Sequence, residues 1–174
     1  GASHSLFLKT DGSLHAMGYN NFGQLGTGNT TNQTSPTQVV ASGVVQVAAG
    51  ASHSLFLKTD GSLWAMGQND NGQLGDGTAD ANPHSTPIRI VASGVVQVAA
   101  GASHSLFLKT NGGLWAMGAN DFGQLGTGNT TLQTSPTQVV ASGATQVAAG
   151  QYHSLFLKSD GSLHAMGRNF YGQL

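Results

Sequence analysis

Apolar and polar side chains alternate in short runs along this chain, and the runs return at a regular spacing. The segment Ser54 to Lys58 alternates around two leucines, and Leu63 to Met66 forms a second short run. Between them lies Asp60-Gly61, a strong short signal for a β-hairpin, because tight two-residue turns need positive φ angles. No helical apolar stripe of about ten or more residues occurs without an interrupting glycine. The pattern therefore predicts hairpins and no helix.

Two further strands complete each unit. A polar loop punctuated by glycine is predicted from Gln68 to Pro87, and the β-branched run Ile88 to Val91 follows it. After a turn at Ala92 to Gly94, the run Val95 to Ala100 leads into the next unit. The second half of that run is small, which is typical of an innermost strand where propeller blades crowd around an axis. Four strands in about fifty residues is the size of one propeller blade.

The hairpin motif occurs four times, beginning at Gly1, Gly50, Gly101 and Gly150. In repeat arrays each unit packs mainly on its neighbours. We predict an all-β fold, a β-propeller of four-stranded antiparallel blades that is either partial or completed by oligomerisation. Its single repeat array spans residues 1–174 and comprises repeats 1–49, 50–100 and 101–149 and a partial repeat 150–174.

Charged side chains are scarce and make up 7% of the chain, with 6 Lys and Arg against 7 acidic residues. Binding to nucleic acid or to an anionic membrane needs a basic face, so neither partner is expected. No apolar run approaches the roughly 18 residues of a membrane span, and we expect no membrane insertion. The chain has no cysteine, which excludes disulfides and thiolate chemistry and fits an extracellular protein as well as a cytosolic one.

Histidine recurs once per unit at His4, His53, His104 and His153. One histidine per blade would be spread around a ring and would not converge within the ~2 Å bonds that zinc requires. A structural hydrogen-bonding role is therefore favoured over a metal site. Two further histidines, His15 and His164, stand where other units have Trp64 and Trp115, which indicates exchange of one flat ring for another at a packing site.

Other signals for chemistry are weak. The loop residues Asp76, Asp80 and Asn82 lack the ordered alternation of oxygen ligands found in calcium loops. The segment Gly72 to Gly75 lacks the Lys-Ser/Thr and the helix of a phosphate-binding loop. Neighbouring His and Ser side chains point to opposite faces of a strand and cannot form a catalytic pair within it. We therefore predict no catalytic residue, no metal and no cofactor, and not an enzyme.

The pattern Val-Ala-Ala-Gly-x-x-His-Ser-Leu-x-Leu, then Gly-x-Leu-Trp-Ala-Met-Gly-x-Asn and Gly-Gln-Leu-Gly-x-Gly, resembles the regulator of chromosome condensation repeat. This resemblance implies a seven-bladed β-propeller. The nearly identical units of low charge are most similar to bacterial members, which include a secreted propeller that inhibits β-lactamases by covering them with one face. The resemblance thus implies an extracellular or cell-surface protein of a bacterium, with a cytoplasmic location as the alternative. The founding member's nucleotide exchange and nucleosome binding use an inserted β-wedge and a basic tail, neither of which we find, so we do not expect those activities here.

Strand direction sorts the loops of such blades onto two faces. The Gly-x-x-His turns and the x-Asn-x-x-Gly-Gln loops share one face, here called the variable face, because their side chains differ between units. The Asp-Gly hairpins and the Ala-Ser-Gly turns share the other, here called the Asp-Gly face, which is nearly uniform. Exposed aromatic residues are enriched at binding hot spots. We predict that a partner binds the variable face at Tyr19, Asn21, Phe22, Gln68, Asp70, Asn71, Asp121, Phe122, Gln151, Tyr152, Arg168, Phe170 and Tyr171.

The sequence allows alternatives for one aromatic repeat position and for the function of the chain. Phe22, Phe122 and Tyr171 recur at one repeat position, and rings at such a position also serve to pack the loop. For function, we predict a non-enzymatic scaffold that binds a macromolecule, in the first place a protein. A second hypothesis is self-assembly into a ring or fibre as a homo-oligomer, although two copies do not splice into seven regular blades. A third is that the chain is an ordered fragment of a larger secreted or cell-surface repeat protein.

Overall fold

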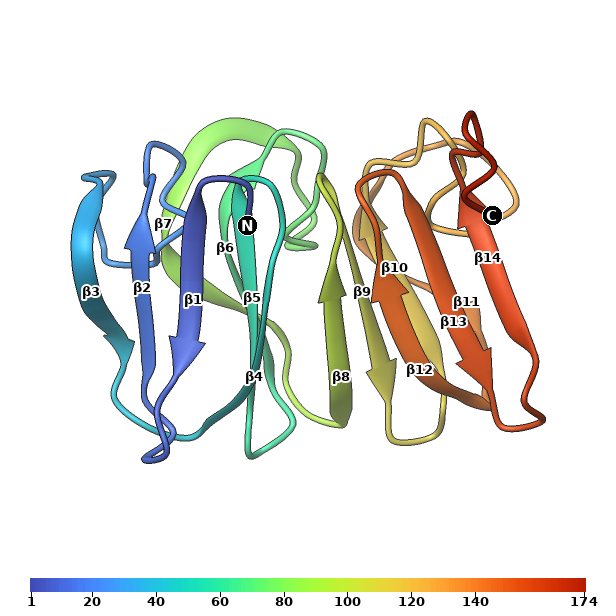
Figure 1. Cartoon of the computed structure of the whole chain (residues 1–174), viewed down its shortest axis with the longest axis horizontal. Helices are drawn as coiled ribbons and strands as arrows, with labels where there is room; N and C mark the ends of the chain where they lie inside the picture. The colour runs from blue at the N-terminus through green and yellow to red at the C-terminus, as the bar shows by residue number, and fades with distance from the viewer.

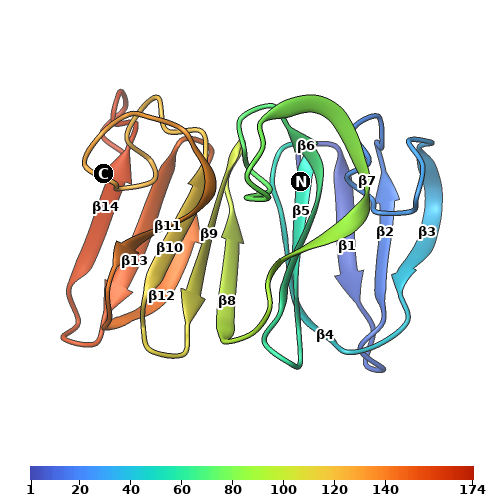
Figure 2. The same ribbon diagram turned by 180° about the vertical axis from the view of Figure 1, so that it is seen from behind.

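The computed structural model describes residues 1–174 and confirms the all-β prediction. Its strands form four antiparallel sheets that stand side by side in chain order (Figures 1 and 2). We call these sheets blades one to four. Blade one contains β1 (His4–Leu8), β2 (Leu14–Gly18) and β3 (Gln33–Val40), and blade two contains β4 (Val44–Ala49), β5 (His53–Lys58), β6 (Leu63–Asn69) and β7 (Asp80–Val91). Blade three contains β8 (Val95–Ala100), β9 (His104–Lys109), β10 (Leu114–Gly118) and β11 (Gln133–Val140), and blade four contains β12 (Ala144–Ala149), β13 (His153–Lys158) and β14 (Leu163–Gly167).

Each complete blade is an up-and-down meander in chain order. The first strands of blades two, three and four, β4, β8 and β12, pack on one another in succession and are therefore innermost. The small residues at the ends of these strands permit that close approach. Blade one lacks such an innermost strand, and blade four lacks an outermost one. No helix of the length and hydrophobicity needed to span a membrane is present.

The outermost strands are longer than the sequence predicted. We expected a loop from Gln68 to Pro87, but β6 continues to Asn69 and β7 already begins at Asp80. The predicted four-residue run is thus only the end of a 12-residue strand. Pro83 and Pro87 lie within it. Proline is tolerated there because an outermost strand has a free edge where no ladder hydrogen bond needs its missing N–H group.

A stacked ring pair braces each central hairpin. Phe56 lies opposite Trp64 in the β5–β6 register, and their rings are parallel within 4° at a centroid separation of 5.9 Å. Phe156 stacks on His164 in blade four in the same way, at 4.7 Å. The histidines that replace tryptophan therefore keep the stacking partner. This agrees with the exchange of flat rings at a packing site that the sequence indicates.

Apolar side chains fill the space between neighbouring blades. Leu14 of blade one packs with Phe56 and Met66 of blade two, and the same contact recurs between blades three and four. Each full junction therefore joins the leucine-rich side of one blade to the aromatic and methionine side of the next. Gln46 adds a polar link between innermost strands, because its side-chain amide accepts from the backbone N–H of Val98 at 3.1 Å and donates to the Val98 carbonyl at 3.3 Å.

A buried hydrogen-bond relay crosses every junction. The His53 Nε2 of blade two lies 2.9 Å from the Ser105 Oγ of blade three, and that hydroxyl donates at 2.8 Å to the carbonyl of Gln73 in blade two. Because the serine proton is used by the carbonyl, the serine oxygen accepts from the histidine, which fixes the neutral Nε2–H tautomer. Equivalent relays join His4, Ser54 and Gln24, and His104, Ser154 and Gln124.

The relay histidines are held neutral by burial. Burial lowers the pKa of His53 to about 3 and those of His4 and His104 to about 4, from an ordinary value of 6.5. Their Nδ1 atoms are buried without a hydrogen-bond partner, so a second ring proton would find no acceptor. Gly50 contributes to this tight packing, because any side chain there would collide with the His53 ring and with the carbonyl of Gly101.

Removing one relay serine should destabilise the fold. Ser105→Ala leaves both the His53 Nε2–H and the Gln73 carbonyl unpaired, and we expect the free energy of unfolding to fall by about 1–3 kcal/mol in urea titrations. Ser5 occupies the same repeat position in blade one but is exposed and has no relay partner. The matched variant Ser5→Ala should therefore shift stability by less than about 0.5 kcal/mol. Equal losses in both variants would contradict the relay.

The relay also predicts a pH dependence. Between about pH 6.5 and pH 4 these histidines bind protons in the unfolded chain but stay neutral in the folded chain, because their folded-state pKa values are lower. The free energy of unfolding therefore falls as the pH falls. The loss is up to about 1.4 kcal/mol per pH unit for each histidine. Urea titrations at pH 7.5, 6, 5 and 4.5 measure it, and His104→Asn should flatten the slope. A constant unfolding free energy from pH 7 to 5 would refute this prediction.

Candidate functional site

The variable face is assembled from two loop types that are tied together in every blade. The backbone N–H of Arg168, which follows β14, donates to the carbonyl of Tyr152 in the turn before β13 at 2.9 Å. Tyr19 and Gln68 form the same bond to Ser3 and Ser52 in blades one and two. The turns before the central hairpins and the long loops after them therefore share one edge of the molecule, the upper edge in Figure 1, while the hairpin tips lie at the lower edge.

A buried asparagine organises each long loop. The Asn120 side chain donates to the carbonyls of Asn129 and Thr131 at 2.9 and 3.1 Å and accepts from the N–H of Leu125 at 3.0 Å. Asn120 is fully buried, and Leu125 beside it fills the interior of the loop. On one side its neighbour Asp121 is exposed, so the residue at that position can change without loss of the loop frame, whereas Ala119 on the other side is buried.

Four of the predicted residues surround a fifth, the cation Arg168. The guanidinium carbon of Arg168 lies within 6 Å of four ring centroids, a distance typical of cation–π contacts. These rings and their distances are Phe170 (4.9 Å), Phe122 (5.4 Å), Tyr152 (5.5 Å) and Tyr171 (5.7 Å). We call these five residues the arginine cluster. It spans the loop of blade three that carries Phe122 and the turn and loop of blade four.

The cluster borders a shallow hollow of about 300 Å³. Phe122, Arg168 and Phe170 line it together with Gly167 and Asn169. Asn169 is absent from the predicted residues, because an asparagine recurs at this position in every unit and only the differing positions were predicted to bind. Its counterparts are fully buried, whereas Asn169 is exposed. Only the structure reveals that difference.

The other predicted residues do not join the arginine cluster. Tyr19 and Phe22 form a separate edge-to-face pair in blade one, 6.3 Å apart. Gln68 and Asn71 of blade two donate to opposite oxygens of Asp70 at 3.0 and 2.9 Å. Three further residues, Asn21, Asp121 and Gln151, are exposed on the same face. The variable face thus has an aromatic patch in blade one, a polar one in blade two and the arginine cluster across blades three and four.

The aromatic residues that recur at one repeat position, Phe22, Phe122 and Tyr171, do not fill the loop interior. That place belongs to Leu25, Leu74 and Leu125, which are fully buried. Phe122 is 40% exposed and Tyr171 is 86% exposed. Phe22 is partly buried against Tyr19. Rings that pack the loop would be shielded from water, so two of the three remain available for contact.

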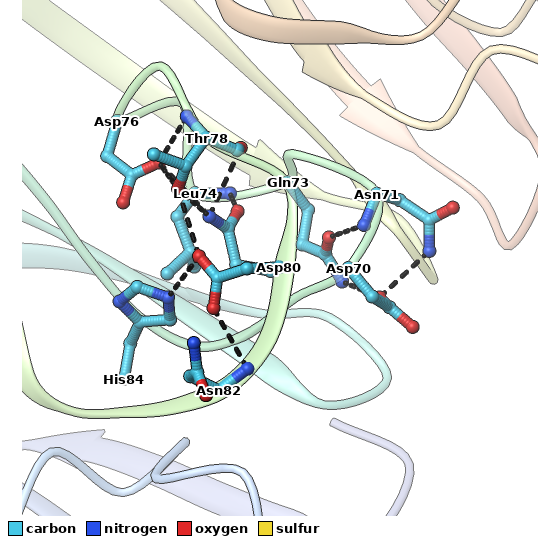
Figure 3. Close-up of polar contacts among 10 residues, drawn as sticks. Asp70, Asn71, Gln73, Leu74, Asp76, Thr78, Asp80, Asn82 and His84 are labelled. Atoms are coloured by element: carbon cyan, nitrogen blue, oxygen red, sulfur yellow. Dashed lines mark hydrogen bonds and ion pairs between the residues drawn. The ribbon is translucent and has the colours of Figure 1, made fainter.

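Two aspartates, Asp76 and Asp80, close the connection between β6 and β7 (Figure 3). Asp76 accepts from the Asn69 side chain at 3.0 Å and from the Thr78 backbone and hydroxyl at 3.0 and 2.8 Å. Asp80 accepts from the Asn82 backbone at 2.9 Å and faces the His84 Nε2 at 3.5 Å. Asp76 Oδ1 and both carboxylate oxygens of Asp80 are thus engaged by groups within residues 69–84. No group of three or more metal-ligating side chains occurs in the structure.

The relay brings histidine and serine together across blades, which the sequence argument did not foresee. At 2.9 Å the His53–Ser105 pair has the spacing of a base and a nucleophile. Both residues are fully buried, however, and the serine hydroxyl is bound to the Gln73 carbonyl. The pair therefore has no access to a substrate, and its geometry favours a structural role in the junction between blades.

The sequence of this chain is similar to a known domain family and to a known protein. The family model described as RCC1-like domain matches residues 1–174. The E3 ubiquitin-protein ligase HERC2 of Homo sapiens is 33% identical over 131 residues, which is 72% of this chain and 3% of that protein.

Solved propellers show the same architecture. Human WBSCR16 superposes with a TM-score of 0.86 at 26% identity, over 99% of this chain and 47% of that one. Yeast RCC1 (Prp20), solved bound to Kap60, superposes with a TM-score of 0.82 at 27% identity, over 97% and 42% of the two chains. The chain therefore spans less than half the length of these two propellers.

Proposed function

The chain belongs to the RCC1-like domain family, and we propose that it is a non-enzymatic scaffold whose variable face binds another protein. Similar propellers bind proteins: Prp20 is bound to Kap60 in one structure, and another reports binding of Prp20p to Gsp1p and histones. This supports a protein as the partner class and leaves its identity open. An extracellular location in a bacterium is part of the proposal and rests on the resemblance of the repeats alone.

The proposal rests on the positions at which repeat one and repeat four differ in sequence. Over their shared 25 positions, residues 1–25 and 150–174 differ at six places, of which five lie on the variable face. The six pairs are Ala2/Gln151, Ser3/Tyr152, Thr10/Ser159, Tyr19/Arg168, Asn21/Phe170 and Phe22/Tyr171. Unconstrained drift would spread the differences over strands and both faces. Their concentration on one face, with new aromatic side chains and a cation, is what selection for binding would produce.

Variants of the variable face should lose binding. Protein binders selected from a display library against the intact chain should bind at least about tenfold more weakly to Tyr152→Ala, Arg168→Ala and Phe170→Ala, because these side chains form the exposed hot spot. Asp11→Asn and Asp60→Asn are matched controls on the Asp-Gly face, since Asn111 already occupies that position in blade three. Titration calorimetry measures the affinities. Equal losses on both faces would refute the assignment.

Self-assembly is a second candidate function, favoured by the open side of blade four. Leu163 is 68% exposed, whereas its counterparts Leu14, Leu63 and Leu114 are fully buried in junctions. Blade one presents the complementary side, with Phe7 and Ser5 exposed or half-buried. A second copy would meet this surface head to tail through the same contacts that join the internal blades.

This second function predicts association of the isolated 174-residue chain. We expect a mass above that of the monomer in sedimentation equilibrium at about 100 µM, since apolar junction surfaces favour pairing. Leu163→Lys places a charge in that junction and should give a monomer. Leu132→Lys changes an equally apolar residue that is 43% exposed in a loop, and it should leave the mass unchanged. A monomeric parent chain would exclude this function.

A further inference from the structure

We propose that the arginine cluster recognises the carboxylate of an Asp or Glu side chain that is flanked by apolar residues on a protein partner. The inference rests on the proposed function, because it specifies the partner chemistry of the variable face. It is carried by the geometry of Arg168, by the absence of any anion for its charge within the chain, and by the exposed rings around it.

The charge of Arg168 has no partner in the protein. The single ion pair of the structure joins His84 and Asp80, and no hydrogen bond involves the Arg168 guanidinium. Its Nε atom is buried without an acceptor. Asp121, which precedes Phe122 in the loop of blade three, is exposed and forms no ion pair with Arg168. The terminal N–H groups of the guanidinium are therefore free to donate to an acceptor on a partner.

The rings position this cation without satisfying its hydrogen bonds. A cation–π contact attracts the charge toward a ring face, but it provides no acceptor for N–H groups. Phe122, Tyr152, Phe170 and Tyr171 thereby restrict the long side chain before any partner arrives, which lowers the entropy lost on binding. Once a partner covers these rings, they also shield an ion pair formed between them from water, which strengthens that ion pair.

A single guanidinium favours a carboxylate over a phosphate. The planar fork of arginine binds either a carboxylate or a phosphate through two parallel hydrogen bonds, so charge decides between them. A phosphorylated side chain carries about −1.5 to −2 charges at pH 7 and is matched by clusters of arginines, whereas a carboxylate carries a single charge. The chain has one other arginine, Arg89, which lies on the outermost strand β7 of blade two and not on the variable face. One cation on this face matches the charge of one acidic side chain.

The rim of the cluster specifies the flanking residues. Phe170 is 74% exposed and Tyr171 is 86% exposed, and both stand beside the hollow or the guanidinium. Burying such rings requires apolar surface on the partner, next to the acid that reaches Arg168. The chain as a whole carries a net charge of −1, so long-range attraction of an acidic partner is weak and recognition is local.

Two blocked peptides test this inference on the intact chain. Acetyl-Gly-Leu-Glu-Leu-Gly-amide and its Gln analogue differ only in the carboxylate, and NMR titration follows the Arg168 Nε–H signal and the backbone amides of residues 152, 168 and 170. We expect the Glu peptide to bind at least about fivefold more tightly, since hydrogen bonds to charged groups exceed neutral ones. Arg168→Met should abolish this preference and Arg89→Met should preserve it.

The outcomes separate the inference from the proposed function. Equal affinities for both peptides, with shifts at the cluster, would overturn carboxylate recognition and leave the variable face as a binding face. Inorganic phosphate that binds Arg168 as tightly as the Glu peptide would show a general anion site and would also overturn it. Absence of any shift at the cluster would refute the inference, while the library selection on the same face decides the proposed function independently. The peptide comparison uses the unmodified chain, so it stands even if Arg168→Met folds poorly.

Discussion

The structure depends on the junction between neighbouring blades. At each one a histidine donates to a serine of the next blade, and that serine donates back to a loop carbonyl of the first blade. The circuit fixes two things at once: the spacing of the sheets and the position of the long loop above them. A strand hairpin alone would be marginally stable in water. Here a buried polar relay, surrounded by leucine, phenylalanine and methionine, makes successive hairpins into one body.

This arrangement separates the loop frame from the loop surface. Asn120 and Gln124 are buried and hold the loop, while their neighbours Asp121 and Phe122 face solvent. Alternation of buried and exposed positions within one short segment allows nearly identical units to present different chemistry. The polar loop of blade two shows the same principle, because Asp76 there takes part in the frame by binding Asn69. Function can therefore change by substitution at a few exposed positions while the fold stays constant.

Much of this could be predicted from the sequence, because hairpins and the two faces follow from local rules. Asp60-Gly61 fixes a turn, strand direction then decides on which face each loop lies, and period-two alternation separates scaffold from surface. The partner of His53 could not be predicted. Ser105 lies 52 residues away, and their contact depends on how two sheets pack, which no periodicity within one unit records. The length of β7 was also missed, since Pro83 argues against a strand unless its edge is known to be free.

The contacts within the arginine cluster could not be predicted from the sequence, because they join residues of two different blades. Sequence placed Arg168 and Phe122 on one face but in different units. Their contact at 5.4 Å requires that the loop of blade three be held against blade four. The relay achieves this, because Ser154 of blade four donates to the carbonyl of Gln124, whose side chain in turn accepts from the N–H of Phe122. The same junction that stabilises the fold thus sets the ring beside the cation. A cluster built across two repeats is in this way held in place by the junction beneath it, although all five of its residues lie in loops or turns.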